Sequence, residues 1–278
     1  MKGSLRTAKG TVSKMKKIGF IGCGNMGGSL ARAVAKTVGG EALLLADLHA
    51  EKAEALAKEL GAVVADADRI AREAHLIVLG VKPQVFAATL APLQTVLAAR
   101  GNGFTLLSMA AGTPISKIAA AAGGEYPVLR IMPNLPASVG EGMILYCKEN
   151  VDGAAEEFFK AAFAGAGVLD EIAEKDIDAA AALSGCGPAF VCLFAEALAD
   201  AAVSCGITRD KAALYAAQTL KGTAVQLLET GVHPEVLKDA VCSPGGTTIA
   251  GVQALEKGAF RAAVQAAVVA AFEKTKKL

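Results

Sequence analysis

Tryptophan is absent from the 278-residue sequence, and aromatic residues make up only 5% of it. A chain that is rich in alanine and poor in aromatics favours closely packed helices over a β-sandwich or barrel. Lys and Arg (28 residues) nearly balance Asp and Glu (27), so no strong positive field is available for nucleic acid and no acidic tail is present. Because 53% of the residues are hydrophobic, a disordered chain is excluded as well.

Paired cysteines and clustered histidines are also missing. The three His are not at metal-ligand spacing, so no zinc site is expected. No Gly-x-Ser-x-Gly turn of a Ser/His/Asp hydrolase occurs. Six cysteines lie apart without a Cys-x-x-Cys pair, and we expect small buried side chains in a reducing cytosol for Cys23, Cys147, Cys186, Cys192, Cys205 and Cys242.

No uncharged run is long enough to suggest a membrane span. The longest considered, 179–195, has 17 residues against the roughly 20 that a span needs, and Gly185-Cys-Gly-Pro188 interrupts it. We expect a soluble chain in which this run is buried inside the protein or between subunits. Residues 1–15 carry basic side chains but no apolar segment, so they are expected to be a disordered basic arm or an expression-vector remnant and not a secretory signal.

The remaining sequence changes character near residue 169. Up to that point short apolar runs alternate with helical patterns, which predicts βαβ crossovers and a mainly parallel sheet. The expected strands are 18–21, 42–46, 62–64, 76–79, 105–108, 128–131 and 143–147, with helices at 26–36, 50–60, 66–72, 85–99 and 114–122. Beyond it only helices are expected, at 176–183, 188–205, 209–229, 234–241, 247–257 and 260–276.

A glycine-rich turn follows the first expected strand. Gly22-Cys-Gly24-Asn25-Met26-Gly27 places Gly-x-Gly-x-x-Gly between a strand and a helix. Gly22 allows the tight turn, Gly24 lets a pyrophosphate approach the backbone, and Gly27 permits close helix–strand packing. The helix N-terminus would then present free N–H groups to the phosphates. The sequence therefore predicts an N-terminal Rossmann dinucleotide-binding domain over residues 16–168.

Asp47 ends the second expected strand, 20 residues after Gly27. A carboxylate there would accept hydrogen bonds from the adenosine ribose and repel a 2′-phosphate, and Lys52 is the only cation close behind it. This favours NADH over NADPH. The alternative is that Asp47 only caps the helix expected from Ala50.

Two further segments end strands at the same edge. Val81-Lys82-Pro83 follows the strand 76–79, where Lys82 could reach a phosphate or lie in solvent. Ala110 and Ala111 follow the strand 105–108, where small residues would let a nicotinamide ring lie close to the backbone or would simply pack.

A second candidate site follows in the helical part. In Cys242-Ser-Pro-Gly-Gly-Thr-Thr248 a glycine turn opens a helix, and the N–H groups of Gly246, Thr247 and Thr248 would form an anion site for a carboxylate. An ordinary N-cap with a glycine turn is the alternative. Ser184-Gly-Cys-Gly-Pro188 is a similar turn, and Asn134 in the rigid loop Met132-Pro-Asn-Leu-Pro136 is free to hydrogen-bond.

From Lys16 to the C-terminus the sequence resembles the pyrroline-5-carboxylate reductases. The resemblance is carried by IGFIGCGNMG, VKP, SxAAG, MPNLP, LSGCGPAF and HPEVLKDAVCSPGGTTIAGVQALEKGAFRAAV. It implies an α/β fold with an N-terminal Rossmann domain and an all-α C-terminal dimerisation and substrate domain over residues 169–278. It also implies cytoplasmic reduction of 1-pyrroline-5-carboxylate to L-proline by NADPH or NADH, in a homodimer or larger homo-oligomer held by the C-terminal helices, with no nucleic acid, membrane or metal.

The resemblance assigns roles to residues already singled out. The cofactor contacts would be Gly22, Gly24, Asn25, Met26, Gly27, Asp47, Val81, Lys82, Pro83, Ala110 and Ala111. The substrate contacts would be Asn134, Ser243, Gly246, Thr247 and Thr248. Thr248 would orient the imine and relay a proton from water, because a threonine hydroxyl is too weak an acid to be its source.

Some positions depart from the family. Cys186 and Phe190 replace the usual hydroxyl residue and the common Tyr of LSGSGPAY, and Asp47 stands where many members have a small hydroxyl or Asn suited to a 2′-phosphate. Three alternatives stay open: a related imine reductase, a 3-hydroxyacid reductase of the same architecture, and a non-catalytic dinucleotide-sensing module.

Overall fold

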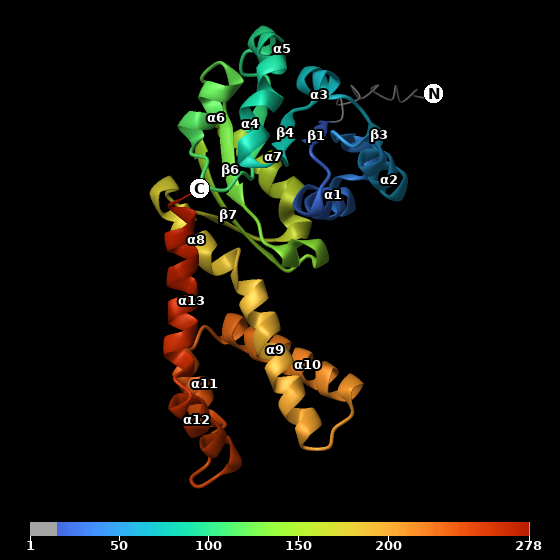
Figure 1. Ribbon diagram of the computed structural model, residues 1–278. Coiled ribbons are helices and arrows are strands. Elements are labelled where there is room, and N and C mark those ends of the chain that lie inside the picture. Colours follow the sequence, from blue (N-terminus) through green and yellow to red (C-terminus); the bar gives the residue numbers. More distant parts are fainter. Residues whose placement is uncertain (1–15, 278) are drawn as a thin grey trace, which may run out of the picture. The chain divides into compact units, whose positions relative to one another are not determined.

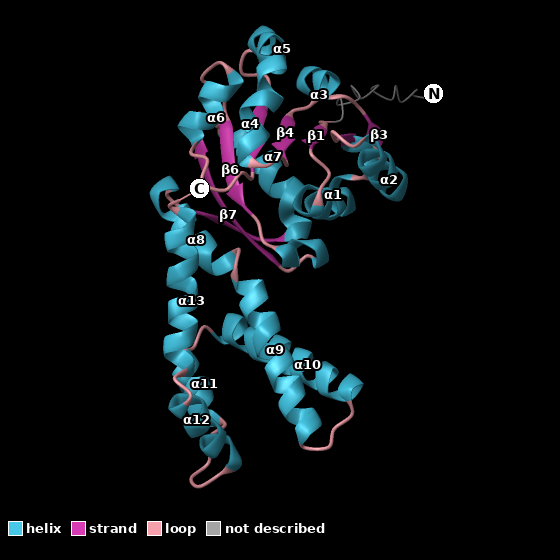
Figure 2. Cartoon of the chain, viewed as in Figure 1, coloured by secondary structure: helices cyan, strands magenta, loops and turns pink. Residues whose placement is uncertain are grey.

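The computed structural model describes residues 16–277, and the chain divides after Glu174 into two compact units (Figure 1). Unit 1 is an α/β unit that ends with Glu174, and unit 2 begins at Lys175. The arm expected over residues 1–15 lies outside the described residues. Figure 2 shows that the strands belong to unit 1, whereas unit 2 is built from helices.

Unit 1 is organised around one eight-stranded sheet with the order β3-β2-β1-β4-β5-β6-β7-β8. Neighbouring strands are parallel except at the β6–β7 pair, which is antiparallel. The direction of chain progression reverses between β1 and β4, which is the point where ligands bind in sheets of this kind. The strands are β1 Ile18–Ile21, β2 Leu43–Ala46, β3 Val63–Val64, β4 Leu76–Leu79, β5 Thr105–Ser108, β6 Val128–Met132, β7 Gly142–Glu149 and β8 Gly167–Glu171.

Helices cover both faces of this sheet. Ile18 and Phe20 of β1 share a buried cluster with Leu30 of α1, whereas a side chain at Gly19 would meet Ile70 of α3. Alternate residues of one strand thus face different helix layers, as a continuously apolar strand predicts. The helices are α1 Asn25–Val38, α2 Ala50–Leu60, α3 Ala67–Glu73, α4 Pro83–Leu90, α5 Gln94–Arg100, α6 Ile115–Ala122 and α7 Gly153–Phe163.

Three features of unit 1 differ from the sequence prediction. The helix expected over 85–99 is two helices, α4 and α5, separated by the short turn Ala91–Leu93. Pro92 in this turn lacks an N–H and cannot continue α4. Helix α7 and strand β8 were not predicted, although Asp152 caps α7 by accepting a hydrogen bond from the N–H of Ala155 (2.7 Å).

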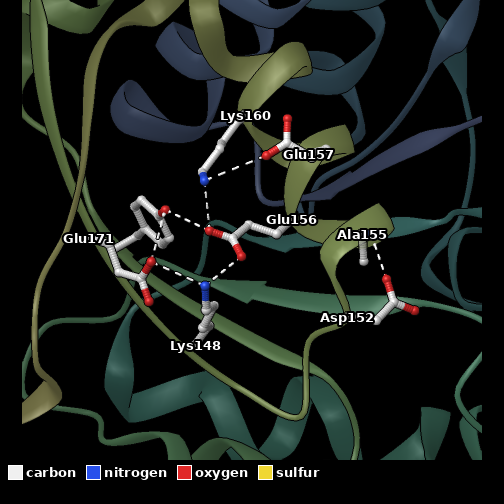
Figure 3. A network of polar contacts seen from close by, with 8 residues as sticks. Lys148, Asp152, Ala155, Glu156, Glu157, Lys160 and Glu171 are labelled. Atoms are coloured by element: carbon white, nitrogen blue, oxygen red, sulfur yellow. Dashed lines mark hydrogen bonds and ion pairs between the residues drawn. The ribbon is translucent and has the colours of Figure 1, made fainter.

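A polar network joins α7 to the last two strands of the sheet (Figure 3). The Glu156 carboxylate accepts hydrogen bonds from the ammonium of Lys148 and from the Tyr146 hydroxyl (2.9 Å), and it pairs with Lys160 at 2.8 Å. Lys148 also donates to Glu171 on β8 (3.1 Å). These contacts lower the pKa of Glu156 to about 2, with the hydrogen bond from Lys148 as the largest cause. The network therefore ties the edge strand β8 and helix α7 to β7.

Unit 2 consists of helices in its described part: the rest of α8 Glu174–Ser184, then α9 Gly187–Ser204, α10 Arg209–Thr230, α11 Pro234–Ala240, α12 Thr247–Lys257 and α13 Phe260–Thr275. Helices α9 and α10 pack on each other through a small cluster of Ala199, Ala212 and Ala216. Many large apolar side chains of this unit are exposed in the single chain, among them Leu193, Leu214 and Leu228. Unit 2 thus buries little apolar surface on its own.

One stretch of helix in the described residues, 174–204, is long and apolar enough by length and composition to cross a membrane. It contains the 179–195 run, and only 11% of its most apolar window is buried within the chain. Of the two expected ways to bury this run, burial inside the chain does not occur, and burial between subunits stays a prediction. Cys186, Cys192 and Cys205 are exposed as well, so the expected burial of all six cysteines holds in the single chain only for Cys23 and Cys147.

Candidate cofactor and substrate sites

The glycine fingerprint forms a close turn at the carboxyl end of β1. Gly22 has φ +105°, and a Cβ there would lie 2.5 Å from the carbonyl oxygen of Gly80. A Cβ on Gly27 would lie 2.1 Å from the carbonyl oxygen of Gly22, so the start of α1 packs directly on the turn. A Cβ on Gly24 would meet nothing within 4 Å. Gly22 thus makes the tight turn, Gly24 leaves the backbone open, and Gly27 permits the close packing of α1, as a dinucleotide site requires.

Helix α1 begins beside the switch point between β1 and β4. Its N-cap is Gly24, and no side chain caps the N–H groups that follow. Gly24 and Asn25 are exposed, and Met26 is half-buried. An uncapped helix N-terminus at an open glycine offers N–H groups and a positive dipole to an anion. The residues present therefore fit the pyrophosphate of a dinucleotide.

Asp47 lies at the carboxyl end of β2, next to the fingerprint. Its Oδ2 accepts a hydrogen bond from the N–H of Cys23 (2.7 Å), and its Oδ1 accepts one from the N–H of His49 (2.9 Å). The N-cap of α2 is His49, and no side chain caps that helix. Asp47 therefore does not cap α2, and it braces the fingerprint turn instead. Burial and, secondarily, the Asp47 charge raise the pKa of the Cys23 thiol to about 11, so this thiol stays protonated.

The other predicted cofactor residues end neighbouring strands. Since β2, β1, β4 and β5 are adjacent and parallel, Asp47, the fingerprint, Val81–Pro83 and Ala110–Ala111 line one edge of the sheet. Lys82 is exposed and is the N-cap of α4, which begins at Pro83. Ala110 is buried. The structure thus brings the sequence-predicted cofactor residues of unit 1 together.

Asn134 follows β6 as predicted, but its side-chain oxygen is already engaged. It is buried after β6, and its Oδ1 accepts a hydrogen bond from the N–H of Met143 (2.9 Å) at the start of β7. The side chain therefore fixes the β6–β7 connection, and its amide oxygen is not free as expected.

The predicted substrate residues of unit 2 form a turn that opens α12. Gly245 has φ +68°, a left-handed conformation that favours glycine, and a Cβ on Gly246 would lie 2.3 Å from Oγ of Ser243. The N–H of Gly246 donates to the carbonyl oxygen of Ser243 (3.0 Å). Of the three N–H groups expected to bind an anion, this one is used inside the turn. Thr247 and Thr248 are exposed in the first turn of α12, which no side chain caps.

Two contributions to unit 1 were missed in the sequence. Gly80, at the end of β4, packs against Gly22, and a glycine directly after a predicted strand was an available signal. Glu174 accepts a hydrogen bond from the N–H of Ile115 (2.6 Å), the first residue of α6, and lies 3.7 Å from Nη1 of the buried Arg130. Nothing in the sequence indicates a cap that is 59 residues away.

Comparisons with known proteins agree with this division. A family model described as pyrroline-5-carboxylate reductase dimerisation matches residues 174–278, and one described as NADP oxidoreductase, coenzyme F420-dependent, matches residues 17–112. A pyrroline-5-carboxylate reductase of Escherichia coli is 39% identical over 95% of this chain and 98% of its own, and one of Arabidopsis thaliana is 38% identical over 94% and 95%.

Solved structures show the same relationship. A pyrroline carboxylate reductase of Plasmodium falciparum with NADP bound has a TM-score of 0.84 at 34% identity, covering 94% of this chain and 97% of its own. A pyrroline-5-carboxylate reductase of Coxiella burnetii has a TM-score of 0.86 at 29% identity, covering 95% and 98%. The predicted fold class, a Rossmann domain followed by a helical region, is confirmed. The chain belongs to the pyrroline-5-carboxylate reductase family, and its reaction is the NAD(P)H-dependent reduction of 1-pyrroline-5-carboxylate to proline.

Proposed function

We propose that the substrate carboxylate binds at the turn that opens α12, and that the dinucleotide binds at the fingerprint turn of unit 1. The observation that supports the substrate site is the first turn of α12, where Thr247 and Thr248 are exposed and no side-chain cap competes with an anion. The hydroxyl of Ser243, held against Gly246, adds a polar group at the same turn. Asn134 contributes by holding the loop after β6 in place.

When bound, the cofactor supplies the hydride, and the protein supplies binding and orientation. Gly24, Asn25 and Met26 would hold the pyrophosphate through backbone N–H groups, while Val81, Lys82 and Pro83 border the same edge. The closely packed Ala110 and the neighbouring Ala111 would leave room for the nicotinamide ring. Holding the nicotinamide and the imine in a reactive geometry lowers the entropic part of the activation barrier to hydride transfer.

Thr248 would orient the imine nitrogen and relay a proton from water, since its hydroxyl is too weak an acid to be the source. In the protonated imine the carbon accepts the hydride, and the nitrogen keeps its proton and becomes a neutral secondary amine. This amine is basic enough to take up a second proton from water near neutral pH, which gives the protonated product. The site turns carry no His, and the Cys23 thiol, with its pKa raised to about 11, is a weak proton donor, so neither a His nor a Cys acid is assigned.

We further propose a cytoplasmic homodimer joined through the C-terminal helices, without nucleic acid, membrane or metal. The apolar groove between α9 and α13, of about 610 Å³ and lined by Phe190, Phe194, Leu198, Phe260 and Val264, supports an interface with a second copy. Residues 16–168 would form the cofactor domain and 169–278 the substrate and dimerisation domain. The boundary between the compact units lies a few residues later in the sequence, after Glu174.

The test is a spectrophotometric assay of nicotinamide oxidation by the purified chain with 1-pyrroline-5-carboxylate and either cofactor. Consumption that depends on the substrate is expected, with release of proline. Equal or faster turnover of a six-membered cyclic imine would instead favour the related imine reductases. Absence of consumption with both cofactors would refute the proposed sites.

A further inference from the structure

The segment that follows β2 presents an unusual pair of side chains. Asp47 is half-buried and held by two backbone N–H groups, at 2.7 Å from Cys23 and 2.9 Å from His49. The next residue, Leu48, is 96% exposed. Both oxygens of Asp47 are held by groups that donate to a charged carboxylate. The carboxylate is therefore fixed in place.

Two of the basic groups near Asp47 are already engaged by acids and are poorly placed to bind the 2′-phosphate of NADPH. His49 lies 3.8 Å from the carboxylate of Glu51, and in the sequence Lys52 is the only Lys or Arg in the ten residues after Asp47. Arg32 lies one turn after Gly28 on α1, and its Nη1 is 3.3 Å from where a Cβ on Gly28 would lie. Its guanidinium, however, is bound by both oxygens of Glu59, at 2.7 and 2.8 Å. His49 and Arg32 are thus each matched by an acid.

The exposed Leu48 adds an apolar surface beside this carboxylate. An exposed leucine is unremarkable alone, but here it borders a fixed hydrogen-bond acceptor at the sheet edge where the adenosine half of a dinucleotide binds. A flat purine ring can cover an aliphatic side chain, and a ribose with two free hydroxyls can donate to a carboxylate. A 2′-phosphate adds up to two negative charges at the same position.

We infer that Asp47 and Leu48 make this enzyme select NADH over NADPH. The inference rests on the proposed cofactor site at the fingerprint turn. Asp47 accepts hydrogen bonds from the ribose hydroxyls and repels a 2′-phosphate, while Leu48 contacts the adenine where an arginine would favour the phosphorylated cofactor. The hydrogen bond from the N–H of Cys23 holds the Asp47 carboxylate in the orientation in which it can accept these hydrogen bonds.

Direct binding measurements test this without turnover. The Kd of NADH and NADPH, and of the fragments 5′-AMP and 2′,5′-ADP, would be measured by fluorescence titration and calorimetry. The wild-type enzyme should bind NADH at least about tenfold more tightly than NADPH. Asp47→Asn removes the charge but keeps an acceptor, and it should shift the Kd ratio about tenfold towards NADPH. Asp47→Ser with Leu48→Arg should shift it further, with the same order for the two fragments.

Glu54→Gln is the matched control, because it removes one exposed carboxylate from α2 in the same unit without touching the end of β2. It should leave the ratio within about twofold. If the wild type binds both cofactors equally, or if Asp47→Asn moves the ratio no more than Glu54→Gln does, the inference is overturned. If instead neither cofactor binds, the proposed cofactor site itself fails, so the two failures are distinguishable.

Discussion

Two alanine substitutions in the fingerprint turn should separate an effect on stability from an effect on cofactor binding. Gly24 and Gly27 lie three residues apart, and each would gain one methyl group on replacement by alanine. At Gly27 that methyl would lie 2.1 Å from the carbonyl oxygen of Gly22, whereas at Gly24 it would meet nothing within 4 Å. The same chemical change therefore strains the protein at one position and enters open space at the other.

The magnitudes follow from this geometry. Since ordinary contacts begin near 3.4 Å, Gly27→Ala forces the turn and α1 apart by more than 1 Å. Such overpacking costs about 1–3 kcal/mol, or a fall in Tm of roughly 2–10 °C for a unit of this size. Gly24 has φ −68° and ψ −166°, which alanine adopts freely. Gly24→Ala should leave Tm unchanged or raise it slightly, because it restricts the unfolded chain by about 0.4–1 kcal/mol.

Gly24→Ala, which should not lower the Tm, should nevertheless weaken cofactor binding. The added methyl on Gly24 would occupy the space through which a pyrophosphate approaches the backbone, so we expect the cofactor Kd to rise at least about tenfold in a protein that melts like the wild type. The assay pairs thermal unfolding of the ligand-free enzyme with fluorescence titration of cofactor. Gly153→Ala, also in open space but at the start of α7, is the control. Wild-type cofactor affinity in Gly24→Ala would refute the placement of the pyrophosphate at this turn.

Three further results are expected. Thr248→Ala should lower kcat/KM by about one to two decades, because a hydrogen bond to a charged group contributes about 1.5–3 kcal/mol. The cofactor Kd should stay unchanged, and Thr248→Ser should recover part of the activity. A change confined to the cofactor KM would contradict the substrate site. Because the pKa of Glu156 falls to about 2 in the folded state, its contribution is present above its ordinary pKa and lost as the pH falls towards 2. Urea titrations of Glu156→Gln should therefore show a flatter loss of stability than the wild type between about pH 4.5 and 2, and parallel curves would contradict this. Leu193→Glu should weaken self-association in light scattering at micromolar concentration, and a monomeric wild type would overturn the dimer.

The Rossmann half was readable from the sequence because its signals are local. A buried strand such as Ile18–Ile21 is a short apolar run, and Gly-x-Gly-x-x-Gly follows it directly. Seven strands were expected close to their observed positions. Strand β8 was missed because its sequence ends in Asp170 and Glu171, which look like a surface turn. Those charges are tolerated at the sheet edge, where Glu171 pairs with Lys148.

The turns of the candidate sites, and the strand ends beside them, could be predicted from local sequence, but the bonds that connect distant segments could not. The turns at Gly22–Gly27 and 243–248 are short motifs in which each residue is explained by its neighbours. The bond from Cys23 to Asp47 crosses 24 residues, and that from Ile115 to Glu174 crosses 59. Such bonds depend on the order of strands in the sheet, which the sequence pattern does not state. The expectation of a free Asn134 failed for the same reason, because its partner Met143 lies on the next strand.

In unit 2 the sequence predicted the helices but not how little of their apolar surface a single chain buries. Its internal cluster consists of three alanines, while Leu193, Leu214 and Leu228 are 69%, 63% and 83% exposed. Each large side chain left in water forfeits about 1.5–3 kcal/mol of burial, so several of them outweigh what three alanines supply. Membrane insertion would bury them too, but Glu196 and Asp200 interrupt the apolar surface of α9. The proposed second copy of the same helices would cover apolar and charged residues alike, and it would supply the core that one chain alone does not give them.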